Sequence, residues 1–364
     1  MSATSILLLG FAIGIAFGAI GHGTRFCTMG AIADIVSMND WSRMRMWLLA
    51  IAVAVLGAAM LEAGGQINLD QSIYRTASLP WLSHLVGGLL FGVGMVLASG
   101  CGARTLMRVG AGNLKSLVVF LVLAISAYAT LHGILGVLRV NTLDTVTIAL
   151  GERRDLATLF AGTGLPPQTA RAVCALAIGG ALAAFCFARR DFLTRAHLLG
   201  GFGIGALVVA GWFVTGVLGH LAEHPDTLQE HFVATSSGRM ESLSFVAPQA
   251  YLLELLMLWS DSSRRLSFSV AVALGVVAGA ALMAVRSRSF RWEGFRDVDD
   301  LVRHLLGGAL MGFGGVTALG CTIGQGISGI STLAPGSFIT LAAVIAGAVA
   351  TLKFTFRRMM RAPQ

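Results

Sequence analysis

The sequence predicts an all-α polytopic membrane protein with about nine spanning helices, additional short re-entrant helices and two inverted-topology repeats. Three observations predict this fold class. The chain of 364 residues is 55% hydrophobic and only 12% charged, whereas soluble domains carry roughly 25% charged residues. Apolar runs of spanning length recur along the chain, and one of them is repeated in the second half. We therefore expect a single integral membrane domain over residues 1–364.

Nine apolar runs are long enough to cross a bilayer, because a spanning helix needs about 20 apolar residues. They cover approximately residues 3–21, 46–64, 81–99, 114–138, 169–188, 197–219, 267–285, 303–320 and 337–356. The first run lacks a preceding basic segment, which favours an uncleaved span over a signal peptide. The shorter apolar segments 26–37, 102–110, 248–259 and 322–333 are too short to span and predict re-entrant helices.

The basic residues predict the orientation of these spans. If the N-terminus lies outside, most of the 26 Lys and Arg residues fall on the inner side, in segments 43–45, 104–115, 189–195, 286–303 and 353–361. The long outer segment 220–245 is acidic or neutral. The positive-inside rule therefore places the N-terminus outside and the C-terminus inside. We attribute the net charge of +8 to this topology signal and expect no nucleic-acid partner.

An internal duplication relates the two halves. The stretch "HLVGGLLFGVGMVLASGC" at 84–101 aligns without a gap on "HLLGGALMGFGGVTALGC" at 304–321, with eleven of 18 positions identical. The predicted topology starts the first copy outside and the second copy inside, so the halves have opposite orientation, as in many transporters. We predict a first inverted repeat over 1–165, a connecting span over 166–189 and a second inverted repeat over 190–364.

Both copies end in Gly-Cys and are followed by glycine-rich chain, "CGARTLMRVGAG" after Cys101 and "CTIGQGISG" after Cys321. Glycine permits the turned backbone that breaks a helix, and the N–H groups at the start of the next piece favour anions. Cys27 lies in a third glycine-flanked interruption, "GHGTRFCTMG". Its equivalent in the second half has no cysteine. We therefore expect three thiols beside a cavity.

The residue types around these thiols favour a soft anion as the substrate. A neutral thiol is a weak donor and a polarisable surface, which suits a reduced sulfur anion, a selenium oxyanion or a soft metal such as copper(I). Glycine amides, Thr322 and Gln325 near the thiols favour an anion. The five cysteines contain no CxxC pair, so we expect neither a disulfide framework nor a metal or other cofactor. Cys174 and Cys186 are expected to pack as small apolar side chains.

Three stretches, "GHGTRFC", "SGCGARTL" and "LGCTIGQGISG", together resemble the YeeE/YedE family of bacterial inner-membrane proteins, the sulfur-transport family. The resemblance extends from about residue 5 to residue 356. It implies nine spans with additional short helices, inverted halves and thiosulfate uptake. In a bacterial inner membrane, the orientation predicted from the basic residues gives a periplasmic N-terminus and a cytoplasmic C-terminus. It also implies that Cys27, Cys101 and Cys321 relay the ion by S–H hydrogen bonds. Members often work beside a TusA-type sulfur carrier, here expected as a separate cytoplasmic partner.

Other functions are compatible with the same three motifs. A selenium compound or another inorganic sulfur species could use the same thiols. A membrane sulfurtransferase could carry a persulfide on one cysteine, but such an enzyme needs an activated nucleophile with a base in reach. No His or carboxylate is adjacent to Cys101 or Cys321 in the sequence. A soft-metal permease is a further alternative. We expect a transporter and not an enzyme.

Overall fold

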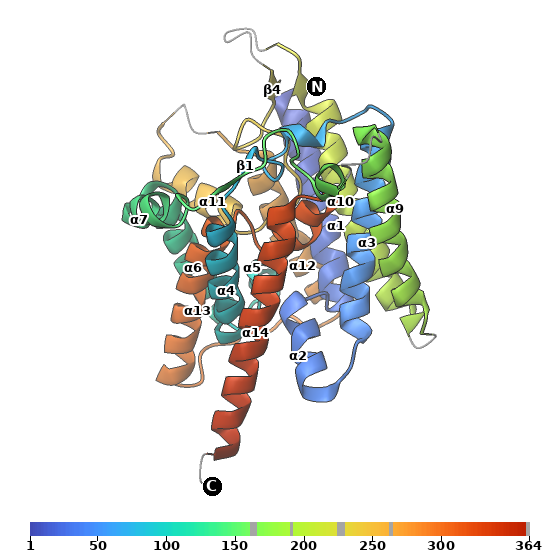
Figure 1. The fold of residues 1–364 in the computed structure, drawn as a ribbon. Helices are drawn as coiled ribbons and strands as arrows, with labels where there is room; N and C mark the ends of the chain where they lie inside the picture. The colour runs from blue at the N-terminus through green and yellow to red at the C-terminus, as the bar shows by residue number, and fades with distance from the viewer. Residues whose placement is uncertain (161–165, 190–191, 224–229, 262–264, 362–364) are drawn as a thin grey trace.

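The apolar runs fold into long helices that connect the face carrying the N-terminus with the opposite face carrying the C-terminus (Figure 1). The computed structural model describes residues 1–160, 166–189, 192–223, 230–261 and 265–361. The long helices are α1 (Ala3–Thr24), α3 (Ser42–Ala63), α4 (Trp81–Leu97), α6 (Leu114–His132), α9 (Pro167–Phe187), α10 (Arg195–Phe213), α12 (Phe268–Arg286), α13 (Val298–Thr317) and α14 (Pro335–Arg361).

The four short apolar segments also form helices, each beside or between long ones. They are α2 (Thr28–Met38), α5 (Gly102–Gly110), α11 (Ala247–Met257) and the π-helix η4 (Gly324–Gly329). The remaining helical pieces are η1 (Leu69–Gln71), α7 (Ile134–Thr142), α8 (Leu156–Phe160) and the π-helix η3 (Val214–Leu218). Two antiparallel strand pairs join loops between the helices: β1 (Ser78–Leu79) with β2 (Ile148–Ala149), and β3 (His220–Leu221) with β4 (His231–Phe232).

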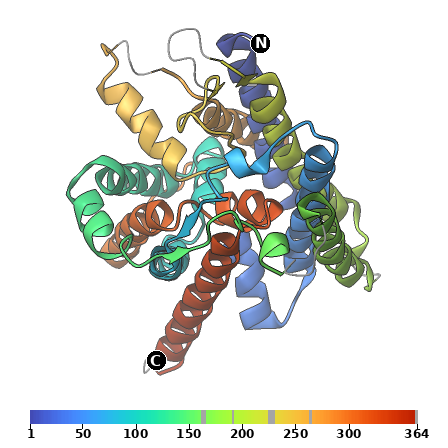
Figure 2. The ribbon, with the colours of Figure 1, turned by 45° about the horizontal axis from the view of Figure 1, so that its top comes forward.

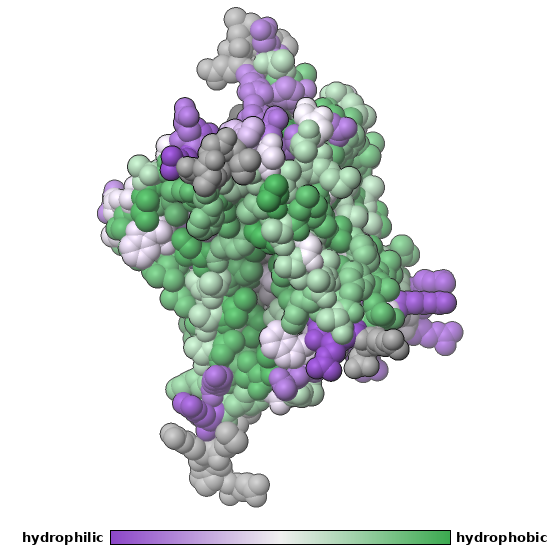
Figure 3. All heavy atoms as spheres, turned by 45° about the vertical axis from the view of Figure 1, so that its right-hand side comes forward, coloured by the Kyte–Doolittle hydropathy of each residue, from purple (hydrophilic) through white to green (hydrophobic). Residues whose placement is uncertain are grey.

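Length and composition make the described chain a polytopic membrane protein. Eight helical segments among the described residues are long and apolar enough to cross a bilayer. Apolar side chains cover the middle of the face shown in Figure 3, and polar side chains gather at its two ends. α13, over the predicted span 303–320, is 20 residues long and is not among these eight segments; its first turn contains Asp299 and Asp300.

One predicted span is shorter than expected. The run 114–138 was predicted as one helix, but α6 ends at His132 and α7 begins at Ile134. Gly133 separates them with an extended backbone at φ −106° and ψ −162°, a conformation outside the helical region. The predicted repeat boundaries at 165 and 190 lie outside the described residues, as do residues 224–229 of the long outer segment.

The long helices pack in pairs that take one member from each part of the chain. α1 packs on α12 and α3 on α10, while α4 packs on α14 and α6 on α13. The repeated helices α4 and α13 also cross each other. A Cβ at Gly87 would lie 2.6 Å from Ala318 N, and a Cβ at Gly307 would lie 2.6 Å from Ala98 N. These matching contacts make the crossing antiparallel and locally two-fold symmetric, and only glycine allows such close backbones.

Candidate functional site

Three long helices end with the same backbone turn. α1, α4 and α13 are each followed by a left-handed residue: Arg25 at φ 56°, Ser99 at φ 57° and Leu319 at φ 58°. Beyond each, a backbone N–H reaches back to the helix, as in Phe26 to Gly21 and Gly100 to Met95, which satisfies carbonyls at the helix end. Two positions after the left-handed residue stand Cys27, Cys101 and Cys321.

Each cysteine therefore lies at the start of the next short helix. Cys27 is the N-cap of α2, and its Sγ accepts the Gly30 N–H at 3.4 Å. Cys101 is the N-cap of α5. Cys321 precedes η4, and its Sγ accepts the Gly324 N–H at 3.3 Å. The unpaired N–H groups and positive dipole end of a helix N-terminus favour negative charge beside these thiols.

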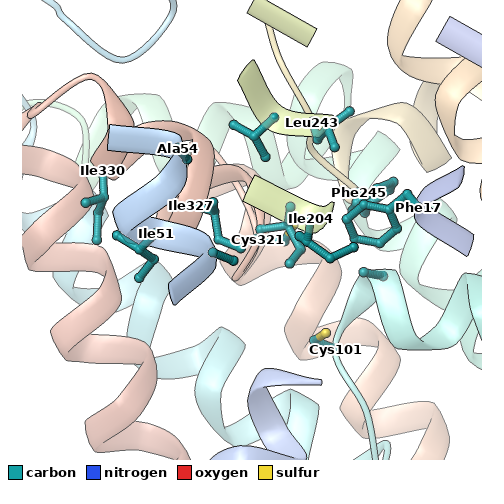
Figure 4. Close-up of a cluster of buried hydrophobic side chains, with 14 of the residues drawn as sticks. Phe17, Ile51, Ala54, Cys101, Ile204, Leu243, Phe245, Cys321, Ile327 and Ile330 are labelled. Atoms are coloured by element: carbon teal, nitrogen blue, oxygen red, sulfur yellow. The ribbon is translucent and has the colours of Figure 1, made fainter. Parts of the chain in front are cut away.

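The structure brings Cys27, Cys101 and Thr322 together. The Cys101 side chain lies next to Cys27 on one side and next to the Thr322 hydroxyl on the other. Cys321 precedes Thr322 in the chain, so all three cysteines belong to one connected group. They are 8%, 2% and 0% exposed in chain order. Figure 4 shows Cys101 and Cys321 within the same buried cluster, and in Figure 2 the orange-to-red chain containing η4 lies near the centre of the bundle.

Two buried hydroxyls beside the thiols have no hydrogen-bond partner. They are Thr322 Oγ1 and Thr28 Oγ1, on side chains that are 2% and 1% exposed. Leaving a buried hydroxyl unpaired costs roughly 1–3 kcal/mol, so such groups are available to a ligand. Thr28 is not among the site residues predicted from the sequence. The Cys-Thr pair that occurs at 27–28 and again at 321–322 is the signal that could have found it.

Gln325 lies beside the break after α13, with both ends of its amide bonded inside the protein. Its Nε2 donates to Ala318 O at 2.6 Å, and its Oε1 accepts from Ser337 Oγ at 2.5 Å. The side chain thereby ties η4 to the end of α13 and the start of α14. Its predicted contact with a substrate stays a prediction.

Two arginine side chains give one side of the cysteine cluster a positive charge. Arg104 and Arg108 on α5 lie close enough to interact electrostatically with Cys27. Arg108 also donates to Ser99 O at 3.1 Å, which anchors it to the turn after α4. Both guanidinium groups lie at the end of the cysteine cluster that faces the predicted inner side.

A cavity of about 260 Å³ lies at the other end of the cysteine cluster. Its lining includes Leu319 and Gly320, the two residues directly before Cys321. The hydroxyls of Tyr74 and Tyr251 and the carboxyl of Glu241 also line it, together with several serines. The cavity therefore offers an approach to Cys321 that carries several polar side chains in a largely apolar lining.

A buried ion-pair network supports the chain beside this cavity. Arg75 is 1% exposed and follows Tyr74. It donates to both oxygens of Glu62, at 2.5 and 3.0 Å, and to Asp70 at 3.2 Å. Its Nε donates to Thr332 O at 2.7 Å, in the turn between η4 and α14. Arg171 on α9 bonds the same two acids and Asp155. The network fixes the segment after Cys321 to the outer loops.

The other two cysteines both lie on α9. Cys186 donates its S–H to Arg45 O at 3.2 Å, and Cys174 is half-buried against the core. α9 contacts α3 and α8.

Comparison with known protein families matches residues 23–350 to the sulphur transport family. This range contains all three cysteine turns and covers most of the chain. The chain belongs to this family. Two similar proteins are both named thiosulfate transporter TsuA. The protein from Escherichia coli is 28% identical over 89% of this chain and 87% of its own length. The protein from Spirochaeta thermophila is 25% identical over 96% of this chain and 99% of its own length.

The family match confirms the resemblance inferred from the three cysteine stretches. The assignment to the sulphur transport family thus rests on the match over residues 23–350 and does not depend on the geometry at the thiols. The geometry adds Thr28 to the residues selected from the sequence, and it leaves the hydroxyls of both Thr28 and Thr322 without a hydrogen-bond partner.

Proposed function

We propose that this protein imports thiosulfate across the bacterial inner membrane along a path through Cys321, Cys101 and Cys27. The observation that carries the proposal is the direct chain of side-chain neighbours from Thr322 through Cys101 to Cys27. Each of these three cysteines lies at a helix break, where backbone N–H groups attract an anion. The similarity to thiosulfate transporters supports this substrate.

The proposed path begins in the outer cavity and ends beside the arginines of α5. Thiosulfate leaves the cavity at Gly320 and passes Cys321, whose thiol donates a weak hydrogen bond to the soft terminal sulfur. The unpartnered Thr322 hydroxyl donates to the oxygen end of the ion on the way to Cys101. Cys27 then passes the ion toward Arg104 and Arg108. Several weak sites in sequence favour passage over trapping.

Two inverted halves form the scaffold in this proposal. The first repeat covers 1–165, the second covers 190–364, and α9 within 166–189 connects them. The antiparallel two-fold crossing of α4 and α13 supports this arrangement, and α13 then serves as the ninth span. The positive-inside rule supports a periplasmic N-terminus and a cytoplasmic C-terminus. A separate TusA-like carrier would receive the sulfur on the cytoplasmic side.

Uptake by cysteine variants tests the proposal. A bacterium unable to use other sulfur sources is grown on thiosulfate with this chain as its only importer, and uptake of radiolabelled thiosulfate is measured. We expect Cys101→Ala and Cys321→Ala to abolish growth and uptake at wild-type membrane levels. Cys174→Ala on α9 is the matched control and should transport normally. Wild-type uptake by either path variant would refute the cysteine relay.

The same assay distinguishes the alternative substrates and the enzyme. Selenite, sulfite and sulfate serve as competing solutes, and stronger competition by selenite than by unlabelled thiosulfate would favour a selenium transporter. Mass spectrometry of the wild-type protein during uptake tests the sulfurtransferase. A stable persulfide on Cys101 or Cys27 would favour covalent sulfur transfer, whereas unmodified thiols agree with passage of the intact ion.

A further inference from the structure

Glu241 occupies a position that conflicts with simple anion passage. It is the one acidic residue among the described residues that line the outer cavity. Its side chain is buried, and its Oε1 accepts the Ser236 N–H at 3.3 Å. Its backbone carbonyl accepts the Thr215 hydroxyl at 2.6 Å. These bonds hold the carboxyl in place beside the route that the proposed substrate takes.

The groups that face Glu241 leave its charge uncompensated. Tyr74 lines the cavity from the segment before β1, and Tyr251 lines it from α11. Arg139 of α7 is the cation in the lining, but its Nε pairs with Asp144 at 3.1 Å. Glu254, also on α11, lies near Tyr251. The remaining polar lining consists of serine hydroxyls, Ser236, Ser237, Ser242, Ser244 and Ser269.

Protonation would change what this cavity can bind. An ionised carboxylate repels a dianion strongly in a buried, low-dielectric cavity. A protonated carboxyl removes that repulsion and provides an O–H donor to an anion oxygen. Burial raises the pKa of Glu241 to about 7, although the Ser236 N–H acts in the opposite direction. The group therefore changes charge within the ordinary range of growth pH.

We propose that the protonated carboxyl of Glu241 forms part of an outer binding site for the sulfur oxyanion, so that each anion bound there is accompanied by one proton. The tyrosine and serine hydroxyls of the cavity supply the other donors. This inference rests on the proposed function, since it assumes that a divalent sulfur anion enters through this cavity. It adds a proton-linked step before the first thiol.

The expected pH effect follows from the fraction of protonated carboxyl. For a group that titrates near pH 7, the apparent affinity falls about tenfold between pH 6 and pH 8. Thiosulfate stays a dianion over this range, so the substrate itself contributes no titration. Gln at position 241 cannot ionise and retains an N–H donor, so Glu241→Gln should bind the anion with little dependence on pH.

Uptake of radiolabelled thiosulfate into proteoliposomes tests the inference, with the external pH varied from 5.5 to 8.5 and the internal pH fixed. The wild-type KM should rise about tenfold from pH 6 to pH 8, and the KM of Glu241→Gln should stay constant. Glu230→Gln is the control, because Glu230 is exposed and pairs with His220 at 2.6 Å. It should keep the wild-type pH profile.

Calorimetry provides a second measurement that does not depend on transport. Thiosulfate is titrated into the detergent-purified wild-type protein at pH 7, in two buffers with different ionisation enthalpies. The difference should correspond to about half a proton taken up per ion bound, and Glu241→Gln should take up none. A pH-independent KM, or binding without proton uptake, would refute the inference alone. Absence of wild-type uptake at every pH would refute the proposed function and the inference with it.

Discussion

The break after α4 and the break after α13 have the same backbone but different surroundings. Each begins with a left-handed residue, Ser99 or Leu319, and each places a buried cysteine at the start of the next helix. After Cys101 the chain forms the α-helix α5, whereas after Cys321 it forms the π-helix η4. The duplicated sequence thus preserves the turn, and the segments that follow have diverged.

The divergence gives the two breaks different charges. The break after α4 carries two arginines and lies against a second thiol, Cys27. The break after α13 carries Thr322 and Gln325 and has no charged residue from Cys321 to Leu333. In the predicted orientation, an uncharged segment beside the outer cavity and a cationic one toward the inner side would draw an anion in one direction. Variants that act on one break and not on the other measure this difference.

Arg75→Leu is expected to have the largest effect on stability. It would leave Glu62, Asp70 and Asp155 with Arg171 as their remaining cation in the network and would remove the bond to Thr332 O. Loss of one partner in a buried ion-pair network costs about 3–5 kcal/mol. The resulting fall in Tm can be measured by thermal unfolding in detergent.

Lys115→Met is the matched variant at the start of α6, the helix that follows α5. Lys115 pairs with Asp300 at 2.8 Å and with the exposed Glu293 at 3.7 Å. Because these partners are more exposed, we expect a loss of only about 1–2 kcal/mol. An equal fall in Tm for both variants would show that the ion pairs stabilise the segments after the two breaks equally.

Glu241→Gln should change the pH dependence of stability at the outer cavity. The pKa of Glu241 is raised to about 7 in the folded protein from 4.5, so the folded state holds the proton more tightly than the unfolded state. The associated stability is complete below pH 4.5 and is lost as the pH rises through 7. At pH 8 the buried carboxylate therefore destabilises the wild type by about 3 kcal/mol.

Thermal unfolding at pH 5 and at pH 8 checks this prediction. The variant should have a higher Tm than the wild type at pH 8 and nearly the same Tm at pH 5. Cys174→Ala, which leaves the outer cavity unchanged, should follow the wild type at both values. A Glu241→Gln variant that loses stability at pH 8 would mean that the carboxylate has a cationic partner when ionised.

The sequence predicted the long helices and the cysteine turns because both depend on local pattern. Apolar length marked the spans, and Gly-Cys after each repeated run marked the breaks at Cys101 and Cys321. The end of α6 was placed wrongly because apolar residues continue past Gly133 into α7. Apolar composition alone does not distinguish a span from a short helix that continues it in another direction.

The surroundings of the thiols could not be predicted from local pattern, since they come from segments far apart in the chain. Cys27 and Cys101 are separated by more than 70 residues in the chain, but their side chains are neighbours in the fold. Glu241 lies in a long polar loop whose sequence gives no sign of burial. Gln325 was selected as a ligand because of its neighbours, and only the fold reveals its bonds to Ala318 and Ser337.

Gly87→Ala and Gly307→Ala should destabilise the protein to the same extent if the α4–α13 crossing is two-fold symmetric. A Cβ at either position would lie 2.6 Å from a backbone nitrogen of the other helix, so the helices must separate. Overpacking of this kind costs about 1–3 kcal/mol. Gly180→Ala on α9 is the control, because nothing lies within 4 Å of the added methyl group. Clearly unequal losses in Tm would indicate that the two halves support the crossing differently.

Thr322→Val is expected to have the smallest effect on stability but a marked effect on transport. The substitution removes a buried hydroxyl that has no partner. The free energy of unfolding should therefore stay the same or rise by up to about 1 kcal/mol, and the Tm should not fall. Uptake should weaken, with a KM about tenfold higher, because a donor to a charged ligand is worth roughly 1.5–3 kcal/mol.

Gln325→Leu is expected to show the opposite pattern and completes this comparison. It removes the bonds to Ala318 O and Ser337 Oγ. The free energy of unfolding should fall by about 1–3 kcal/mol, which thermal unfolding will show as a lower Tm.

Thr317→Val is the control for Thr322→Val, because the Thr317 hydroxyl bonds Phe313 O within α13 and should not affect uptake. A Thr322→Val variant with wild-type KM and reduced Tm would place this hydroxyl in the scaffold and leave the thiols as the donors after the cavity.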